Sequence, residues 1–297
     1  MHQTRQMKKL LYQLDTDPHP AVFDNVLAYD GGADHVTAYG GVTPQNVGSL
    51  VEGAIFTRAP RDKKLTALFI GGSSMAEGEA LLAAVRAKFF ANFRVSVMLD
   101  SNGANTTAAA ALAWLAHRAP GGTLRGQRAV VLAGTGPVGQ RAALLLAREG
   151  AQVLITGRQA DRTAAIARAL SERAGATIEG RGAADMAERA RAVEGAQLVL
   201  ATGAGASQLL SEQAWSGQDS LQMLCDASPT PPAGIEGIDP MDRGVLRHGK
   251  LCFGAIGFGA LKLALHRRCV ARLFEQQDLV LDADEIFAMA RRMVAEG

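Results

Sequence analysis

The sequence has few of the residues that build metal sites, disulfide frameworks or membrane spans. Only 3 of its 297 residues are cysteine, namely Cys225, Cys252 and Cys269. Their wide spacing excludes a C-x-x-C motif and predicts reduced, mostly buried thiols in a cytoplasmic protein. The 6 histidines show no H-E-x-x-H or similar spacing, so we expect no bound metal. No apolar run reaches the roughly 18 residues that span a bilayer.

An excess of charge of one sign is also absent. Lys and Arg number 31 against 29 Asp and Glu, the two signs are interspersed, and the formal net charge is +2. This pattern predicts neither a nucleic-acid surface nor a polybasic membrane patch. Residues 1–9 are basic, but the apolar stretch after them ends at Asp15. This stretch is too short for a signal peptide. With 48% hydrophobic residues, the chain can bury the cores of two domains.

The most informative stretch is 129–139, where an apolar run ends in the pattern G-x-G-x-x-G. An Ala- and Leu-rich segment and a second apolar run at 152–156 follow, which predicts a strand, a glycine turn, a helix and a strand. In that context Gly134 permits the tight turn, Gly136 lets the backbone approach a pyrophosphate, and Gly139 lets the helix pack on the strand. A tight turn without a ligand is the alternative for the glycine pattern alone. We expect the whole turn and the helix N-terminus to bind a dinucleotide, through Gly134, Thr135, Gly136, Pro137, Val138 and Gly139.

The end of the second strand distinguishes the two nicotinamide dinucleotides. NAD-binding folds place a carboxylate there for the ribose 2′-OH, whereas this sequence has Arg158, with Arg162 four residues later. Guanidinium groups suit a 2′-phosphate because they form paired, charge-assisted hydrogen bonds with it. Solvated charges opening a helix are the alternative, which is weakened because cations are unfavourable at a helix N-terminus. We therefore expect the cofactor to be NADP.

A second α/β unit precedes the glycine turn, because apolar runs alternate there with helical segments, the pattern of a parallel sheet. The runs that predict strands are 8–14, 35–39, 65–70 and 94–99, and the segments that predict helices are 20–29, 43–56 and 76–90. Thr43 and Pro44 suit the N-cap and the first position of the second of these helices.

A dense polar cluster, residues 100–107, follows the last of these strands. Polar loops at the carboxyl ends of parallel strands are where α/β proteins bind ligands, so we expect a substrate site here. The alternative is a helix cap, since Asn105 or Thr106 needs only to cap the helix after it. One cap does not account for an Asp, a Ser, two Asn and two Thr together.

The expected architecture is therefore α/β with two domains. A hinge at 119–122 divides an α/β substrate domain, residues 1–120, from a Rossmann-type NADP-binding domain, residues 121–267. Apolar positions near the C-terminus predict two helices that pack back on the first domain, which adds residues 268–297 to it.

Two further positions near the predicted cofactor remain open. Thr202 and Gly203 begin a small-residue loop, 202–205, that can lie beneath the nicotinamide ribose or form only a tight turn. Lys262 is the single charge in the glycine-rich, apolar stretch 253–265, whose repeated glycines suggest backbone close to a flat ligand or another helix. A functional lysine and a lysine that snorkels from a helix start are equally open for this residue.

Several longer runs of the sequence are specific when taken together, namely QLDTD at 13–17, YDGGADH at 29–35, MLDSNG at 98–103, NTTAAA at 105–110, AVVLAGTGPVG at 129–139 and GFGALKL at 257–263. Through these runs the sequence resembles, over nearly the whole chain, the NADP-dependent methylene-tetrahydromethanopterin/methylene-tetrahydrofolate dehydrogenases of methylotrophic bacteria. The resemblance implies hydride transfer from a methylene-tetrahydropterin to NADP⁺, which gives the methenyl form. It also implies a homo-oligomer, a trimer or a hexamer.

The same resemblance implies roles for individual residues. Lys262 lies in the active site, where we expect it to position the substrate, paired or facing the pterin ring. Asp17 and Asp100 are the favoured pair for the guanidine-like edge of the pterin, because carboxylates accept hydrogen bonds from it. The full set of expected substrate-binding residues is Asp15, Asp17, Asp100, Asn102 and Thr106.

Two other functions stay open from the sequence. One is an NADP-dependent reductase of a small acid, similar to shikimate dehydrogenase. It would need a Lys/Asp pair in the first domain, for which Lys63 and Lys64 in a charged loop give poor support. The other is a non-catalytic NADP-binding sensor, which would have no need of the polar cluster at 100–107.

Overall fold

The computed structural model describes residues 7–203, 205 and 207–296. Most of the basic stretch 1–9, and Ala204 in the expected loop after Gly203, lie outside these residues. The chain divides into two compact units, one of Met1–Thr106 with Leu263–Met289 and one of Thr107–Lys262 with Ala290–Gly297. In the part of the chain that the structure describes, no helix is both long and apolar enough to cross a membrane.

The first unit contains a five-stranded, fully parallel sheet in the order β12-β4-β3-β1-β2. Its strands are β1 (Leu10–Asp15), β2 (His35–Tyr39), β3 (Thr66–Gly71), β4 (Ser96–Leu99) and β12 (Val280–Leu281). Every residue of β3 and β4 is buried, as expected for continuous apolar runs covered on both faces of a parallel sheet. The strand order reverses between β1 and β3. Open α/β sheets bind ligands beside the loops that follow the two strands at such a point.

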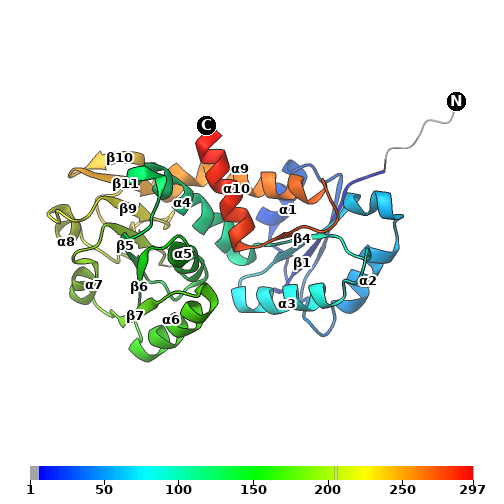
Figure 1. Ribbon diagram of the computed structural model, residues 1–297, viewed down its shortest axis with the longest axis horizontal. Helices are drawn as coiled ribbons and strands as arrows, with labels where there is room; N and C mark the ends of the chain where they lie inside the picture. Colours follow the sequence, from blue (N-terminus) through cyan, green and yellow to red (C-terminus); the bar gives the residue numbers. More distant parts are fainter. Residues whose placement is uncertain (1–6, 204, 206, 297) are drawn as a thin grey trace. The chain divides into compact units, whose positions relative to one another are not determined.

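The helices of this unit cover both faces of its sheet, with α1 on one side of the strands and α3 on the other (Figure 1). They include α1 (Val22–Asp30), α2 (Gly48–Phe56), α3 (Met75–Ala87) and the first residues of α4 (Ala104–Arg118), with the 3₁₀ helices η1 (Pro60–Leu65) and η2 (Ser101–Gly103). Ser74 caps α3 by accepting a hydrogen bond from the Glu77 backbone N–H at 3.3 Å.

The start predicted for α2 is wrong. The helix begins at Gly48, with Val47 as N-cap, and not at Pro44. The Asn46 side chain instead accepts from the Thr43 N–H at 2.8 Å and donates to the Gly41 carbonyl at 3.0 Å. These side-chain bonds close a loop over 41–46 and compete with helix formation.

The second unit contains a seven-stranded sheet in the order β10-β11-β9-β8-β5-β6-β7, in which only the β10–β11 pair is antiparallel. Its strands are β5 (Arg128–Leu132), β6 (Gln152–Gly157), β7 (Ile178–Gly182), β8 (Leu198–Ala201), β9 (Met223–Asp226), β10 (Arg243–Arg247) and β11 (Lys250–Gly254). From β7 to β11 this is the order 3-2-1-4-5-6 of a dinucleotide-binding fold. The switch point lies between β5 and β8.

The helices of the second unit lie on both faces of its sheet, α5 and α6 on one side and α7 and α8 on the other (Figure 1). They are α5 (Pro137–Arg148), α6 (Ala160–Ala174), α7 (Met186–Val193) and α8 (Glu212–Ser216), with the 3₁₀ helix η3 (Pro120–Gly122). A capping box of Asp185 and Glu188 starts α7, and Gly175 ends α6 in the left-handed conformation. Both follow the expected helix end rules.

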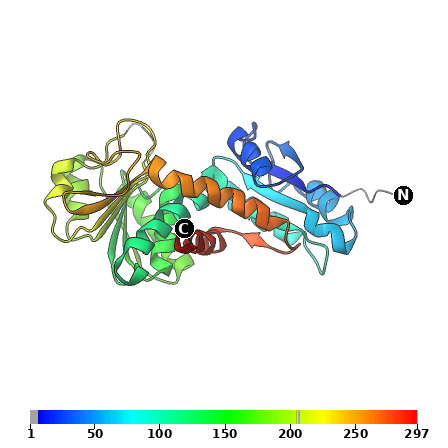
Figure 2. The ribbon, with the colours of Figure 1, turned by 90° about the horizontal axis from the view of Figure 1, so that it is seen from above.

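The boundary between the units runs through three helices. Thr106 and Thr107 lie inside α4, and Lys262 and Leu263 lie inside α9 (Ala255–Leu273), a single continuous helix in Figure 2. The sequence placed the boundaries at 120/121 and 267/268, because a Pro-Gly hinge is easier to detect than a division inside a helix. The last helix, α10 (Ala283–Glu296), is also divided, after Met289.

The glycine-rich stretch 253–260 is not a loop. Its first residues end β11, and the rest form the first turns of α9. A Cβ atom on Gly254 or Gly257 would come within about 2.1 Å of a carbonyl of the loop 239–242. The chain's own loop, and not a flat ligand or another helix, therefore accounts for these two glycines.

Candidate functional site

The glycine turn after β5 has the geometry of a phosphate-binding loop. A Cβ atom at Gly139 would lie 2.6 Å from the Gly134 Cα, so helix and strand pack too closely for any side chain there. A Cβ atom at Gly136 would meet only the Ala133 carbonyl, at 3.9 Å. Nothing in the described chain therefore requires glycine at 136, whereas a pyrophosphate against the N-terminus of α5 would require it. Pro137 occupies the first position of α5, where a missing N–H costs nothing.

A pocket of about 620 Å³ opens above this turn, within the usual size range of small-molecule sites. Of the residues predicted to bind the cofactor, it is lined by Thr135, Gly136, Arg158, Thr202 and Gly203. Arg162, one turn further along α6, is exposed and does not line it.

Arg189 of α7 also lines this pocket, and the sequence analysis did not single it out. Its guanidinium donates to the Leu209 carbonyl at 2.8 Å and to the Ala184 carbonyl at 3.1 Å. It therefore joins the loops after β7 and β8 and adds a second cation to the pocket. No local sequence pattern separates this arginine from the other charged residues of its helix.

The loop after β8 is tied to the glycine turn. The Thr202 hydroxyl donates to the Leu132 carbonyl at 3.0 Å. A Cβ atom at Gly139 would lie 2.6 Å from the Thr202 hydroxyl oxygen. Thr202 thus packs between the two strands that flank the switch point.

At the end of β9, burial raises the pKa of the Asp226 carboxyl, while the backbone N–H groups of Ser228 and Ile235 that donate to it act in the opposite direction.

In the first unit, the loops after β1, β3 and β4 are joined by hydrogen bonds. Asp17 accepts from both the backbone N–H and the hydroxyl of Ser73, at 3.0 and 2.9 Å. The Asn102 N–H donates to the Gly72 carbonyl at 2.6 Å. Ser73 is not among the residues expected from the sequence to bind substrate, although its position in a polar loop directly after a strand was the signal.

The residues expected to bind substrate divide into two groups. Asp15, Asp100 and Thr106 are fully buried. Asp15 accepts from the N–H groups of Asp17 and Ala21, both at 3.0 Å. Asp100 accepts from the Thr106 N–H at 3.0 Å and from its hydroxyl at 2.6 Å.

The second group is accessible. Asp17 is partly exposed and Asn102 is exposed. Asn102 has a φ of 56°, in the left-handed region, where non-glycine residues concentrate at functional sites. Lys262 lies two turns into α9 and is half-buried.

Lys63 lies elsewhere. It precedes β3, at the amino edge of the sheet, and is buried with its Nζ 3.0 Å from the Asn92 carbonyl and 3.8 Å from the centre of the Phe93 ring. Asp100 follows β4 at the carboxyl edge. The two residues therefore do not form the Lys/Asp pair that a shikimate-dehydrogenase-like site requires.

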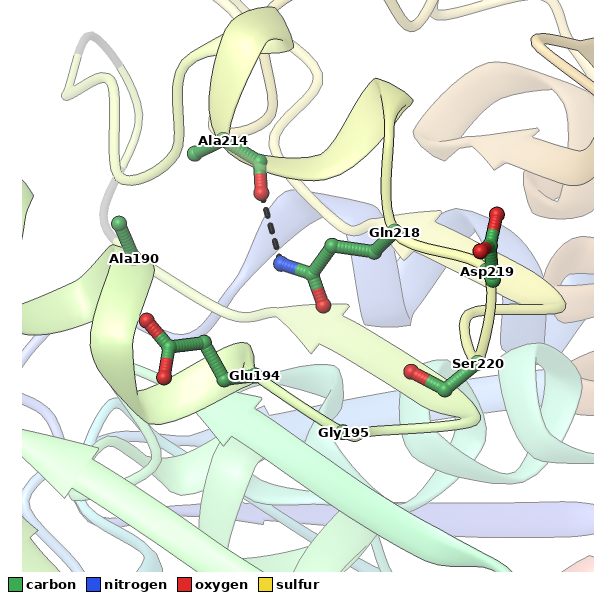
Figure 3. Close-up of a pocket in the computed structure, with 7 residues that line it drawn as sticks. All are labelled: Ala190, Glu194, Gly195, Ala214, Gln218, Asp219 and Ser220. Carbon is green, nitrogen blue, oxygen red and sulfur yellow. Dashed lines mark hydrogen bonds between the residues drawn. The ribbon is translucent and has the colours of Figure 1, made fainter.

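Another pocket, of about 570 Å³, lies at the opposite edge of the seven-stranded sheet (Figure 3). It is lined by Ala190, Glu194, Gly195, Ala214, Gln218, Asp219 and Ser220, which precede β8 and β9. The Gln218 amide donates to the Ala214 carbonyl at 2.7 Å. Its lining has two carboxylates and no cation, so it suits a pyrophosphate less well than the pocket above the glycine turn does.

Comparison with solved structures shows the same fold. The ligand-free 5-ketofructose reductase of a Gluconobacter strain matches with a TM-score of 0.52 at 15% identity, covering 97% of this chain and 99% of that one. Quinate dehydrogenase from Corynebacterium glutamicum, in complex with NAD, matches with a TM-score of 0.52 at 12% identity and the same coverage.

Comparison of sequences gives the family. A profile described as "Methylene-tetrahydromethanopterin dehydrogenase, N-terminal" matches residues 22–102. The "Bifunctional protein MdtA" of Methylorubrum extorquens is 52% identical over 286 residues, which are 96% of this chain and 99% of the relative. The "NAD(P)-dependent methylenetetrahydromethanopterin dehydrogenase" of the same organism is 31% identical over 293 residues, 95% and 98% of the two chains. The chain therefore belongs to the methylenetetrahydromethanopterin dehydrogenase family.

Proposed function

We propose that this protein is an oxidoreductase that oxidises the methylene bridge of methylene-tetrahydromethanopterin, and of methylene-tetrahydrofolate, to the methenyl form with NADP⁺. The observation that carries the proposal is the 52% identity to the bifunctional relative over almost the full length of both chains. The named activity of the second relative supports the same reaction.

The residues around the glycine turn fit an NADP molecule. The open position at Gly136 and the N-terminus of α5 would receive the pyrophosphate. Arg158 would pair with the 2′-phosphate, with Arg189 as a further cation in the same pocket. Thr202 and Gly203 would lie near the nicotinamide ribose. When bound, NADP⁺ supplies the hydride acceptor.

The substrate chemistry explains why the first unit offers amides and carboxylates without a catalytic triad. A hydride leaves the carbon between two nitrogen atoms, whose lone pairs stabilise the cation that forms. No proton moves, so no general acid or base is needed. The chain has to orient the pterin, with the reacting atoms within about 3–3.5 Å of each other, and to exclude water.

We assign direct contact with the pterin to the accessible groups, Asp17 and Asn102, and orientation of the substrate to Lys262. The buried groups, Asp15, Asp100 and Thr106, would act by shaping the loops that carry the accessible ones. We also propose a cytoplasmic homo-oligomer, a trimer or a hexamer, as the family resemblance implies. Light scattering after size exclusion measures the subunit number.

The test is NADPH formation at 340 nm with the two methylene-pterins in parallel, each with NADP⁺ and with NAD⁺. We expect turnover of both pterins, with kcat/KM higher for NADP⁺ than for NAD⁺. Equal turnover with both cofactors would keep the reaction and reject the role of Arg158. Tight NADP binding with no turnover of either pterin would reject the reaction and favour a sensor.

A further inference from the structure

One buried polar side chain has no role in the function proposed above. His266 of α9 has no exposed surface. Among the residues that the structure describes, neither of its ring nitrogens has a hydrogen-bond partner of good geometry. Buried polar groups are normally paired, so an unpaired imidazole in a core requires an explanation.

Two phenylalanine rings and one carboxylate lie near His266. Its ring centre lies 5.3 Å from that of Phe69 and 6.4 Å from that of Phe23, which meets it edge-on. The Asp100 Oδ2 lies 3.4 Å from the imidazole Nδ1. Neither side chain has exposed surface, so little water screens their interaction.

Asp100 is the residue that shapes the loop after β4. Its two oxygens already accept hydrogen bonds from the N–H and the hydroxyl of Thr106, at 3.0 and 2.6 Å. Asn102, in the left-handed conformation and facing solvent, lies inside the turn that these bonds close. The imidazole therefore supports the buried side of a turn whose outer side carries a residue that we assign to the pterin.

We propose that His266 is a positioning residue for the pterin, acting through Asp100 on the 100–106 turn. This rests on the proposed function, since it names what positions that substrate. It distinguishes His266 from the apolar residues of α9, which only pack. It also accounts for the unpaired imidazole, since the ring is kept in the core for its contact with Asp100.

The test compares three substitutions at one position. His266→Phe keeps a ring of similar shape without a donor, His266→Gln keeps an N–H donor, and His266→Asn is too short to reach Asp100. We expect KM for the methylene-pterin to rise on the order of tenfold in the phenylalanine and asparagine variants, because both lose the buried contact with Asp100. The glutamine variant should stay within about threefold of wild type, with the Kd for NADP⁺ unchanged in all three.

Val270→Ala is the matched control. Val270 is buried on the same helix and packs against Gly31, not against Asp100. It should lower the melting temperature and leave KM for the pterin unchanged. If it raised KM as much as His266→Phe does, the effect would be one of general helix packing and the inference would be wrong.

The outcomes separate this inference from the proposed function. A wild-type protein that binds NADP⁺ and turns over no pterin rejects the function. A wild-type enzyme that is active, with an unchanged pterin KM in the phenylalanine variant, rejects His266 alone. If the phenylalanine variant does not fold, as judged by loss of NADP⁺ binding, the asparagine and glutamine variants decide by the same criterion. Equal KM values in those two variants would then overturn the proposal.

Discussion

The two sheets present polar groups at their carboxyl ends in different ways. In the seven-stranded sheet, the pocket above the glycine turn is lined by backbone and by side chains such as Arg158 and Arg189 that face it. In the five-stranded sheet, most of the polar cluster at 100–107 faces inward, since the following are all fully buried: Asp100, Ser101, Asn105 and Thr106. A dinucleotide is bound largely by backbone, which a glycine pattern encodes, whereas a pterin must be met by side chains on loops that other side chains first have to shape.

The largest expected effect comes from the closest backbone approach. Gly139→Ala should abolish measurable NADP⁺ binding and destabilise the protein by about 1–3 kcal/mol, because the added Cβ atom would lie 2.6 Å from the Gly134 Cα. Isothermal titration calorimetry and urea unfolding measure the two quantities. The control is Gly53→Ala in α2, where a Cβ atom meets nothing within 4 Å, so a gain of about 0.5–1 kcal/mol is expected. Normal NADP⁺ affinity in Gly139→Ala would show that the turn does not bind the cofactor.

Cofactor selection should depend on one arginine of the pair. Arg158→Ala should raise KM for NADP⁺ on the order of 10- to 100-fold, with KM for NAD⁺ nearly unchanged, because only NADP⁺ has a 2′-phosphate. Arg162→Ala, whose side chain does not line the pocket, should have a smaller effect. Steady-state kinetics with both cofactors measure this. Equal losses with NADP⁺ and NAD⁺ would place Arg158 on another part of the dinucleotide.

Replacing the buried Asp100 and replacing the accessible Asp17 should have different effects on stability and on activity. Asp100→Ala should cost about 2–3 kcal/mol of unfolding free energy, since it leaves buried donors of Thr106 unpaired. Asp17→Ala should cost about 1 kcal/mol and lower kcat/KM for the pterin on the order of tenfold. Ser73→Ala removes one of the two Ser73 donors to Asp17, the hydroxyl, and serves as its control. Similar stability losses in the two aspartate variants would remove the distinction between the groups.

The smallest expected effect concerns two buried thiols, Cys252 in the second unit and Cys269 in the first. Burial, followed by the charge of Asp242, raises the pKa of Cys252 in β11 to about 12, and burial raises the pKa of Cys269 in α9 as well. The folded protein therefore keeps these protons, whereas the unfolded chain loses them above about pH 9. The contribution of the thiols to the free energy of unfolding is fully present below pH 9 and is lost as the pH rises toward 12. For each thiol the loss is about 1 kcal/mol between pH 9 and pH 10. Urea unfolding at both pH values, with Cys252→Ala and Cys269→Ala, assigns the share of each of these two thiols, and an unchanged slope in both variants would contradict this origin.

Much of the fold could be predicted because its signals are local. Continuous apolar runs predicted the strands around the glycine turn, and their alternation with helices predicted parallel sheets. Signals that compete locally were misjudged, as at Thr43 and Pro44, where the Asn46 side chain closes a loop in place of a helix start. The two-residue strand β12 was not detectable, because its pairing with β4 joins positions nearly 200 residues apart.

The sequence by itself determined the α/β class, the glycine turn and the family, because each depends on residues adjacent along the chain. Only the tertiary structure decided which polar residues face a ligand. It placed Arg189 in the pocket above the glycine turn, turned Asp100 and Thr106 into the core, and brought His266 to within 3.4 Å of Asp100. The contact of His266 with Asp100 joins segments more than 100 residues apart. The direction of a side chain on a loop depends on the packing beneath it, which no short pattern encodes.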